Sequence, residues 1–136
     1  MRRLLPFALA ATLLAAGCAQ QTRSDSLTNT LNAYASAVRW NGLQGGLQFV
    51  DPKVLKAHPP SDFDIERFKQ VRVTDYDDGG GPVALDDAEV QQTVQIRFVN
   101  VHTQVERSIT ERQVWRYDDK AKHWWLESGL PDIQRD

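Results

Sequence analysis

The chain has 136 residues, of which 16 are Lys or Arg and 18 are Asp or Glu, and its formal net charge is −2. This length is enough for one domain with a single hydrophobic core and too short for two. Its basic residues are scattered through a mildly acidic chain, which argues against nucleic acid as a partner, because phosphate binding needs a clustered basic face.

The first residues have the layout of a secretory signal. Arg2 and Arg3 form a cationic start, and residues 4–16 are apolar apart from one proline and one threonine. This apolar run is shorter than the ~20 residues needed to span a bilayer. We therefore expect an export signal here and not a membrane-spanning helix.

The end of this signal carries a second motif. Ala16 and Gly17 are followed at once by Cys18, the only cysteine of the chain. The motif resembles the lipobox of bacterial lipoproteins, which implies cleavage of a signal peptide at residues 1–17 and a lipid such as palmitate on Cys18. The remaining 119 residues would carry a formal charge of −4, because the signal contains two arginines and no acid. In that family, Ala19 in place of Asp implies the inner leaflet of the outer membrane, facing the periplasm.

The mature chain is expected to begin with a tether and a helix. Residues 18–26 are polar and lack an apolar period, which predicts a tether, with Ser24 and Ser26 as candidate helix caps. Gly42 is placed to end the helix that follows. The spacing of four, three and four between its apolar residues predicts one buried stripe: Leu27, Leu31, Tyr34 and Val38.

A less regular stretch comes next. Residues 43–50 are compatible with either a second short helix or an irregular link. Asp51 followed by Pro52 predicts one helical turn over residues 51–56, with the aspartate as cap and the proline in the first helical position.

The remainder is expected to be β-structure. From Asp62 to residue 76 the apolar residues do not share parity, which predicts a strand with a bulge or with both faces buried. Residues 77–82 form a turn, and residues 90–98 alternate strictly between polar and apolar, as in a half-buried strand. After a reversal near residues 100–104, a long strand and a final strand at residues 123–127 follow. One face of the long strand is expected to hold Val105, Ile109, Trp115 and Tyr117.

This order of elements predicts an α+β domain at residues 27–131, followed by a polar tail at residues 132–136. An N-terminal amphipathic helix would pack on a curved antiparallel sheet of long strands. A polar face and bulges favour curling of such a sheet, so one of its sides should be concave.

A second resemblance concerns this domain and covers most of residues 27–130. Tyr34 and Trp40 in the first helix, and the ending Val114-Trp115-Arg116-Tyr117 … Trp124-Trp125-Leu126, resemble the cone-shaped nuclear transport factor 2-like superfamily. That superfamily includes ketosteroid isomerases, polyketide cyclases, dehydratases and members that only bind or scaffold, so the fold does not choose the function. No catalytic residue of its enzyme families can be matched here position by position.

The chain offers little local support for catalysis or metal binding. His102 shares parity with Phe98 if no bulge intervenes, but a histidine at a strand end is more often a surface residue. The three histidines are far apart in sequence, and the aspartates near residue 77 lack the glutamate that ends a calcium loop. We therefore expect no catalytic, cofactor-binding or metal residues.

The tryptophans are the most informative side chains. Neighbours in a strand point to opposite faces, so one of Trp124 and Trp125 should enter the core and the other should face outward. An outward tryptophan either packs under neighbouring chain or serves as an anchor for a partner. Candidate pocket or partner contacts are Tyr34, Trp40, Phe98, His102, Trp115, Trp124 and Trp125.

These observations favour a lipid-anchored, non-catalytic accessory or binding module of the bacterial cell envelope, with an envelope protein as partner. The alternative is a small-molecule-binding protein or enzyme that uses the concave face. An open pocket lined by Phe98, Trp115 and a paired ionisable group would favour that alternative, whereas a concavity filled by Leu31, Tyr34 and Trp40 would oppose it. A homodimer through the outer face of the sheet is a third hypothesis.

Overall fold

The computed structural model describes residues 5–133, with side chains from Gly17 onward. Arg2 and Arg3 of the expected signal, and residues 134–136 of the expected tail, lie outside this part. The described elements are α1 (Leu5–Asn41), a 3-10 helix η1 (Leu43–Phe49), α2 (Pro52–Ala57), α3 (Asp62–Lys69), β1 (Val71–Asp77), β2 (Val83–Ala84), β3 (Glu89–Asn100), β4 (Glu106–Asp118) and β5 (His123–Leu126).

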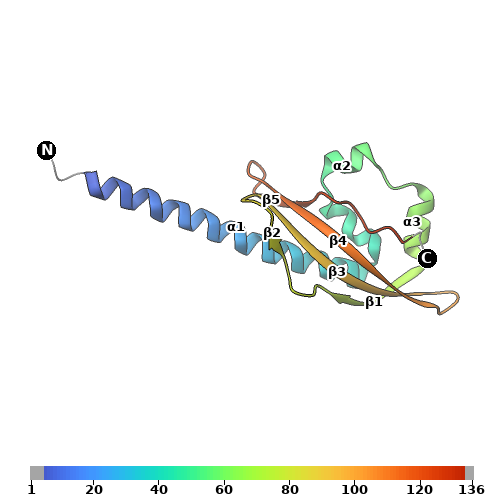
Figure 1. The fold of residues 1–136 in the computed structure, drawn as a ribbon. Coiled ribbons are helices and arrows are strands. Elements are labelled where there is room, and N and C mark those ends of the chain that lie inside the picture. The colour runs from blue at the N-terminus through green and yellow to red at the C-terminus, as the bar shows by residue number, and fades with distance from the viewer. Residues whose placement is uncertain (1–4, 134–136) are drawn as a thin grey trace.

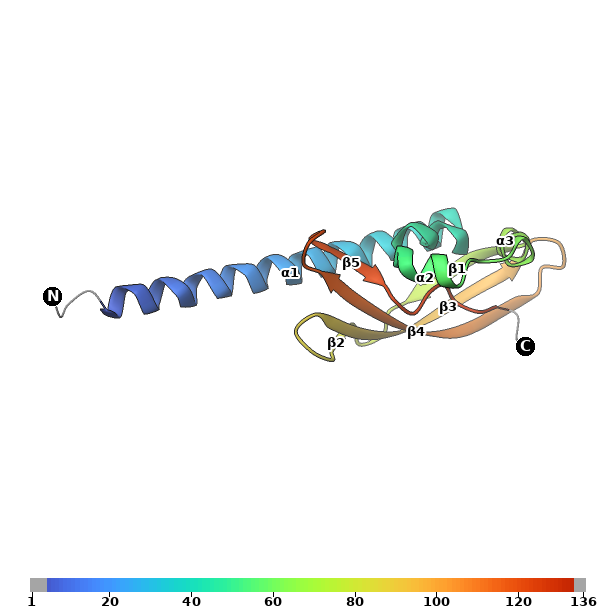
Figure 2. The ribbon, with the colours of Figure 1, turned by 90° about the horizontal axis from the view of Figure 1, so that it is seen from above.

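Within the described residues, the five strands form one antiparallel sheet. Its strand order is β1-β3-β4-β5, and the short β2 pairs with the beginning of β3. The sheet is strongly curled into a half-barrel dominated by β3 and β4, and the helices lie on one side of it (Figures 1 and 2). The expected α+β class, with a helix packed on a curved antiparallel sheet, is therefore confirmed.

The first helix is longer than expected. It is continuous from Leu5, and its first half projects beyond the sheet (Figure 1), so residues 18–26 are helical and Ser24 and Ser26 do not cap it. Neither glycine nor proline occurs between Gly17 and Gly42, so nothing in this stretch interrupts a helix once it has formed. Within residues 5–133, no helix combines the length and apolar character needed to cross a membrane.

The apolar stripe and the end of α1 are confirmed. Tyr34 and Val38 are fully buried, while Leu27 and Leu31 pack half-buried against the core. The helix ends at Asn41, and Gly42 has a φ of +82°, a value that favours glycine.

The segment after α1 is a short helix, η1, and not an irregular link. It turns back so closely onto α1 that a Cβ at Gly45 would lie 2.7 Å from the carbonyl oxygen of Ala37. Only glycine fits at this approach.

The prediction of a strand from Asp62 onward is wrong for residues 62–69, which form helix α3. The helix starts with a capping box, in which Asp64 N–H donates to Ser61 Oγ at 3.1 Å and Ser61 N–H donates to Asp64 Oδ2 at 3.0 Å. Ile65 and Phe68 break strand parity because they are three residues apart on one helical face.

The strands beyond Val71 largely follow the alternation of the sequence. A bulge between Val73 and Asp75 shifts the register of β1 against β3, as expected. Val105 is the exception, because it lies before β4 and is exposed instead of sharing a core face with Trp115. The short strand β2 was not expected.

Candidate functional site

Polar side chains lie buried on the concave face of the sheet, beneath α1. Tyr34 of α1 donates its hydroxyl hydrogen bond to Glu111 Oε1 of β4 at 3.2 Å. Gln113, two residues along β4, donates to the hydroxyl of Tyr76 at 3.0 Å and accepts from Trp115 Nε1 at 3.0 Å. These bonds link α1, β1 and β4 in one polar network.

Glu111 is the unusual member of this network. Its side chain is only 6% exposed, and its Oε2 atom has no hydrogen-bond partner in the described residues. Burial raises the pKa of the Glu111 carboxyl to about 7, and the hydrogen bond from Tyr34 opposes part of that rise. Burial and the neighbouring carboxylate likewise raise the pKa of Tyr34, so this hydroxyl stays protonated and donates.

Aromatic rings fill the rest of the concave face. The ring of Tyr34 meets Trp115 edge-on with centroids 5.3 Å apart, and it meets Phe49 at 5.5 Å in the same manner. Trp115 is fully buried, and Phe98 is buried as well, with the guanidinium of Arg107 over its ring. The structure therefore brings Tyr34, Phe98 and Trp115 into the core.

Two of the candidate contact residues lie elsewhere. Trp40 is 75% exposed at the end of α1, where the guanidinium of Arg39 covers its ring, so it does not fill the concavity. His102 is exposed in the turn after β3, where its N–H donates to Asn100 Oδ1. It lies beyond the strand and so does not share the inward face of Phe98.

The two adjacent tryptophans of β5 point to opposite faces, as expected. Trp124 is buried, and its Nε1 donates to the carbonyl of Arg23 in α1 at 3.2 Å. Trp125 is half-buried on the outer face, with its ring 4.2 Å from that of His123. The outward tryptophan is thus partly covered by its own strand.

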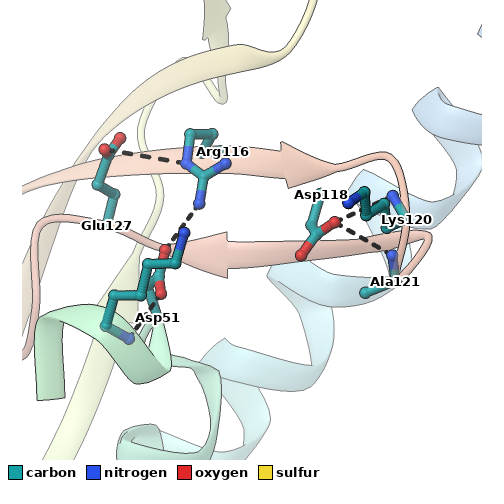
Figure 3. A network of polar contacts seen from close by, with 7 residues as sticks. Asp51, Arg116, Asp118, Lys120, Ala121 and Glu127 are labelled. Carbon is teal, nitrogen blue, oxygen red and sulfur yellow. Dashed lines mark hydrogen bonds and ion pairs between the residues drawn. The ribbon is translucent and has the colours of Figure 1, made fainter. Parts of the chain in front are cut away.

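A second polar cluster joins α2 to the outer face of the sheet (Figure 3). Arg116 of β4 donates to Asp51 Oδ2 at 2.8 Å and lies 3.9 Å from Glu127. Asp51 also caps α2 by accepting from Lys53 N–H at 2.9 Å. Burial alone would raise the pKa of Asp51, but these two donors hold it below its ordinary value.

Replacing Asp51 with alanine should lower the free energy of unfolding by about 1–2 kcal/mol, because both the helix cap and the ion pair are lost. Asp51→Asn keeps a capping oxygen and should lose less than half of that. Urea denaturation at pH 7 measures both. Equal losses in the two variants would show that the cap contributes nothing.

Two cavities flank the segment at residues 128–133, which we name the C-terminal strap. A groove of about 630 Å³ lies between α2, α3 and the strap, and its apolar wall includes Val54, Leu55, Phe68 and Ile133. A smaller cavity of about 230 Å³ lies between the strap and residues 109–112 of β4, which include Glu111. The strap therefore separates two hollows, and the smaller one borders the buried carboxylate.

Glu111 and Gln113 were not among the residues selected from the sequence. Their positions in the sequence do indicate burial, because Glu111 and Gln113 share parity with Ile109 and Trp115, which are expected on the core face. A polar side chain with core parity in a long strand is therefore a useful indicator of a buried network.

Comparison with known proteins does not assign these features, because no family model, curated protein or solved structure matches the chain. Among the described residues, no group of three or more His, Cys, Asp or Glu side chains is placed to hold a metal ion.

Proposed function

We propose that this protein is a lipid-anchored, non-catalytic binding module of the bacterial cell envelope, attached through Cys18 to the inner leaflet of the outer membrane. The observation that supports the anchor most directly is the placement of Cys18. Its side chain is exposed, and it belongs to the first half of α1, the half that projects beyond the sheet (Figure 1). A modified thiol at this position would meet no obstacle from the domain.

The same geometry supports a close attachment. Arg23 donates from Nη1 to the carbonyl of Asp87, in the loop between β2 and β3, at 3.2 Å, and its guanidinium lies over the ring of Tyr117 in β4. Arg23 lies only five positions after Cys18, which is about 8 Å along the helix. A lipid on Cys18 would hold this end of the sheet near the membrane and raise the effective concentration of the module for a partner there.

The filled concave face supports a binding role without catalysis. Tyr34 and Trp115 are fully buried against one another, and neither of the two cavities described above is lined by Tyr34, Phe98 or Trp115. The observation in favour of a catalytic alternative is the Glu111 carboxylate with its tyrosine partner, a pair suited to acid–base chemistry. A substrate would have to displace Tyr34 to reach it from the concave side.

Cys18→Ser should abolish membrane association, because the thiol that would carry the lipid is lost. The measurement is metabolic labelling with a radioactive fatty acid, followed by fractionation of cells into soluble and membrane material. Ala19→Asp is the matched control, which should remain labelled and membrane-bound. A Cys18→Ser protein that still fractionates with membranes and keeps its lipid label would contradict the anchor.

A partner can be sought with the anchored protein in its native cell. Chemical crosslinking followed by mass spectrometry should recover an envelope protein bound to the domain. Recovery of crosslinks only between copies of this chain would instead favour the homodimer hypothesis. The outer sheet face offers mainly polar residues for such a dimer, among them Thr93, Gln95 and Arg97, which are exposed.

A further inference from the structure

Strand β4 has an open edge. It is paired with β5 only at residues 115–118, so within residues 5–133 no strand lies beside its earlier residues on that side. Val114 shows which peptide groups point there: its carbonyl accepts from Glu127 N–H at 2.8 Å, and its N–H donates to Ser128 Oγ at 3.0 Å. Tyr117 N–H points the other way, to the carbonyl of Ala88 before β3.

The same alternation of peptide orientation holds for the earlier residues of β4. Peptide groups of alternate residues point to the same edge of an antiparallel strand, so those of Thr110 and Arg112 point to the open edge. Neither residue has a hydrogen-bond partner on that side in the described part of the chain. An unpaired edge of this kind is the usual template for an added strand.

The C-terminal strap spans this edge and is held near it at both ends. One end is held by Ser128, and at the other end the carbonyl of Ile133 accepts from Arg107 Nη1 at 3.4 Å. Among the described residues, those at 129–131 donate no hydrogen bond to β4, and the cavity of about 230 Å³ lies between them and the strand. The space beside Thr110 and Arg112 is therefore a cavity that lies between the strand and the strap.

A buried carboxylate lies on the inner side of this edge. Glu111 is between the two open peptide groups, points to the concave face and lines the cavity. Among the described residues, its Oε2 has no hydrogen-bond partner and Glu111 forms no ion pair. A buried carboxylate without a cation is unfavourable, and a donor that reached it would be bound more strongly than at an exposed site.

We propose that the open edge of β4 binds an extended segment of a partner protein that places a lysine or arginine opposite Glu111. The backbone of that segment would pair with Thr110 and Arg112, which is the β-augmentation mode of peptide recognition. A residue opposite Glu111 points to the same face with its Cβ about 5 Å away, within reach of the carboxylate.

This choice of occupant follows from both observations together. A free amine could pair with Glu111 but would leave the peptide groups of Thr110 and Arg112 unpaired. An acidic or apolar strand could pair with those groups but would leave the carboxylate without a cation. The inference rests on the binding half of the proposed function, whose partner it describes, and is independent of Cys18.

The test uses the full chain, labelled with nitrogen-15 and purified in detergent, and two synthetic peptides. One is Ac-Thr-Val-Thr-Lys-Thr-Val-Thr-NH2, and its twin has Glu in place of Lys. Titration at pH 8, where the Glu111 carboxyl is charged, is followed by NMR. It should shift the amide signals of Thr110, Arg112 and the strap, with the lysine peptide bound about tenfold more tightly than its twin, a difference of about 1.4 kcal/mol. In Glu111→Gln this preference should fall below about threefold, since the amide carries no charge.

The second part of the test removes one backbone N–H group from the open edge. Thr110→Pro removes the N–H that points to the open edge and leaves the hydrogen bonds to β3 in place, so it should abolish binding, whereas Thr110→Val should bind like the parent. Equal affinity for the two peptides, shifts confined to the large groove, or no shift at millimolar peptide would each overturn the inference. None of these results would affect the labelling experiment on Cys18, so the two proposals fail separately.

Discussion

Replacing Tyr34 with alanine should lower the free energy of unfolding by about 4 kcal/mol, the range observed when large aromatic side chains are removed from a packed core. The ring is fully buried and touches Trp115, Phe49 and Tyr76 edge-on, so its loss leaves a cavity that rigid strands cannot close. The hydrogen bond to Glu111 is lost as well.

Two controls separate these contributions in urea denaturation at pH 5. Tyr34→Phe keeps the ring and removes only the donor to Glu111, so it should lose about 1–2 kcal/mol. Ser36→Ala lies on the exposed face of the same helix and should change stability by less than about 0.5 kcal/mol. If Tyr34→Ala lost less than 1 kcal/mol, Tyr34 would not be what fills the concave face, and the ligand-binding alternative would gain support.

The sequence predicted well those features that depend on neighbours in the chain. The end of α1 follows from Gly42, the start of α2 from Asp51 and Pro52, and β3 from its strict alternation. Each of these signals acts within one or two turns or along one strand. These elements are therefore determined by local sequence, and tertiary contacts do not change them.

The errors arose where two local signals competed. In α3 the spacing of Ile65 and Phe68 fits a helix, but together with the apolar residues of the bulged strand that follows it also fits one irregular strand. In α1 the polar character of residues 18–26 favours a tether, but these residues include no glycine or proline that would interrupt a helix. Contact of Arg23 with the sheet could not be anticipated, since it depends on where the loop with Asp87 lies.

The candidate binding edge was beyond prediction for a different reason. Parity places Glu111 on the core face, but an open edge at Thr110 exists only because β5 pairs with four residues of β4 and the chain then leaves the sheet. The path of the strap is set by packing of residues distant in sequence, such as Leu130 near Gly46 and Tyr34. Strand order and strand length, which short-range patterns do not contain, thus decide where this site lies.

Glu111 should make the domain less stable as the pH rises. An unfolded chain releases this proton near pH 4.5, whereas the folded protein retains it up to about pH 7, because burial disfavours the charged form. Between these values the folded state binds the additional proton, so its stability is greatest below pH 4.5 and falls as the pH approaches 7. The loss should be about 3 kcal/mol, at roughly 1.4 kcal/mol for each unit of pKa difference.

Glu111→Gln isolates this contribution, because the amide has nearly the shape of the protonated acid and does not titrate. Parent and variant should have similar unfolding free energies at pH 4.5, and the variant should be more stable by about 3 kcal/mol at pH 8. The three histidines and the other carboxylates are common to both proteins, so their contributions cancel in the difference. A difference independent of pH would mean that Glu111 has the same pKa in the folded and unfolded states, as expected if water or a cation already reaches Oε2 through the cavity beside the strap.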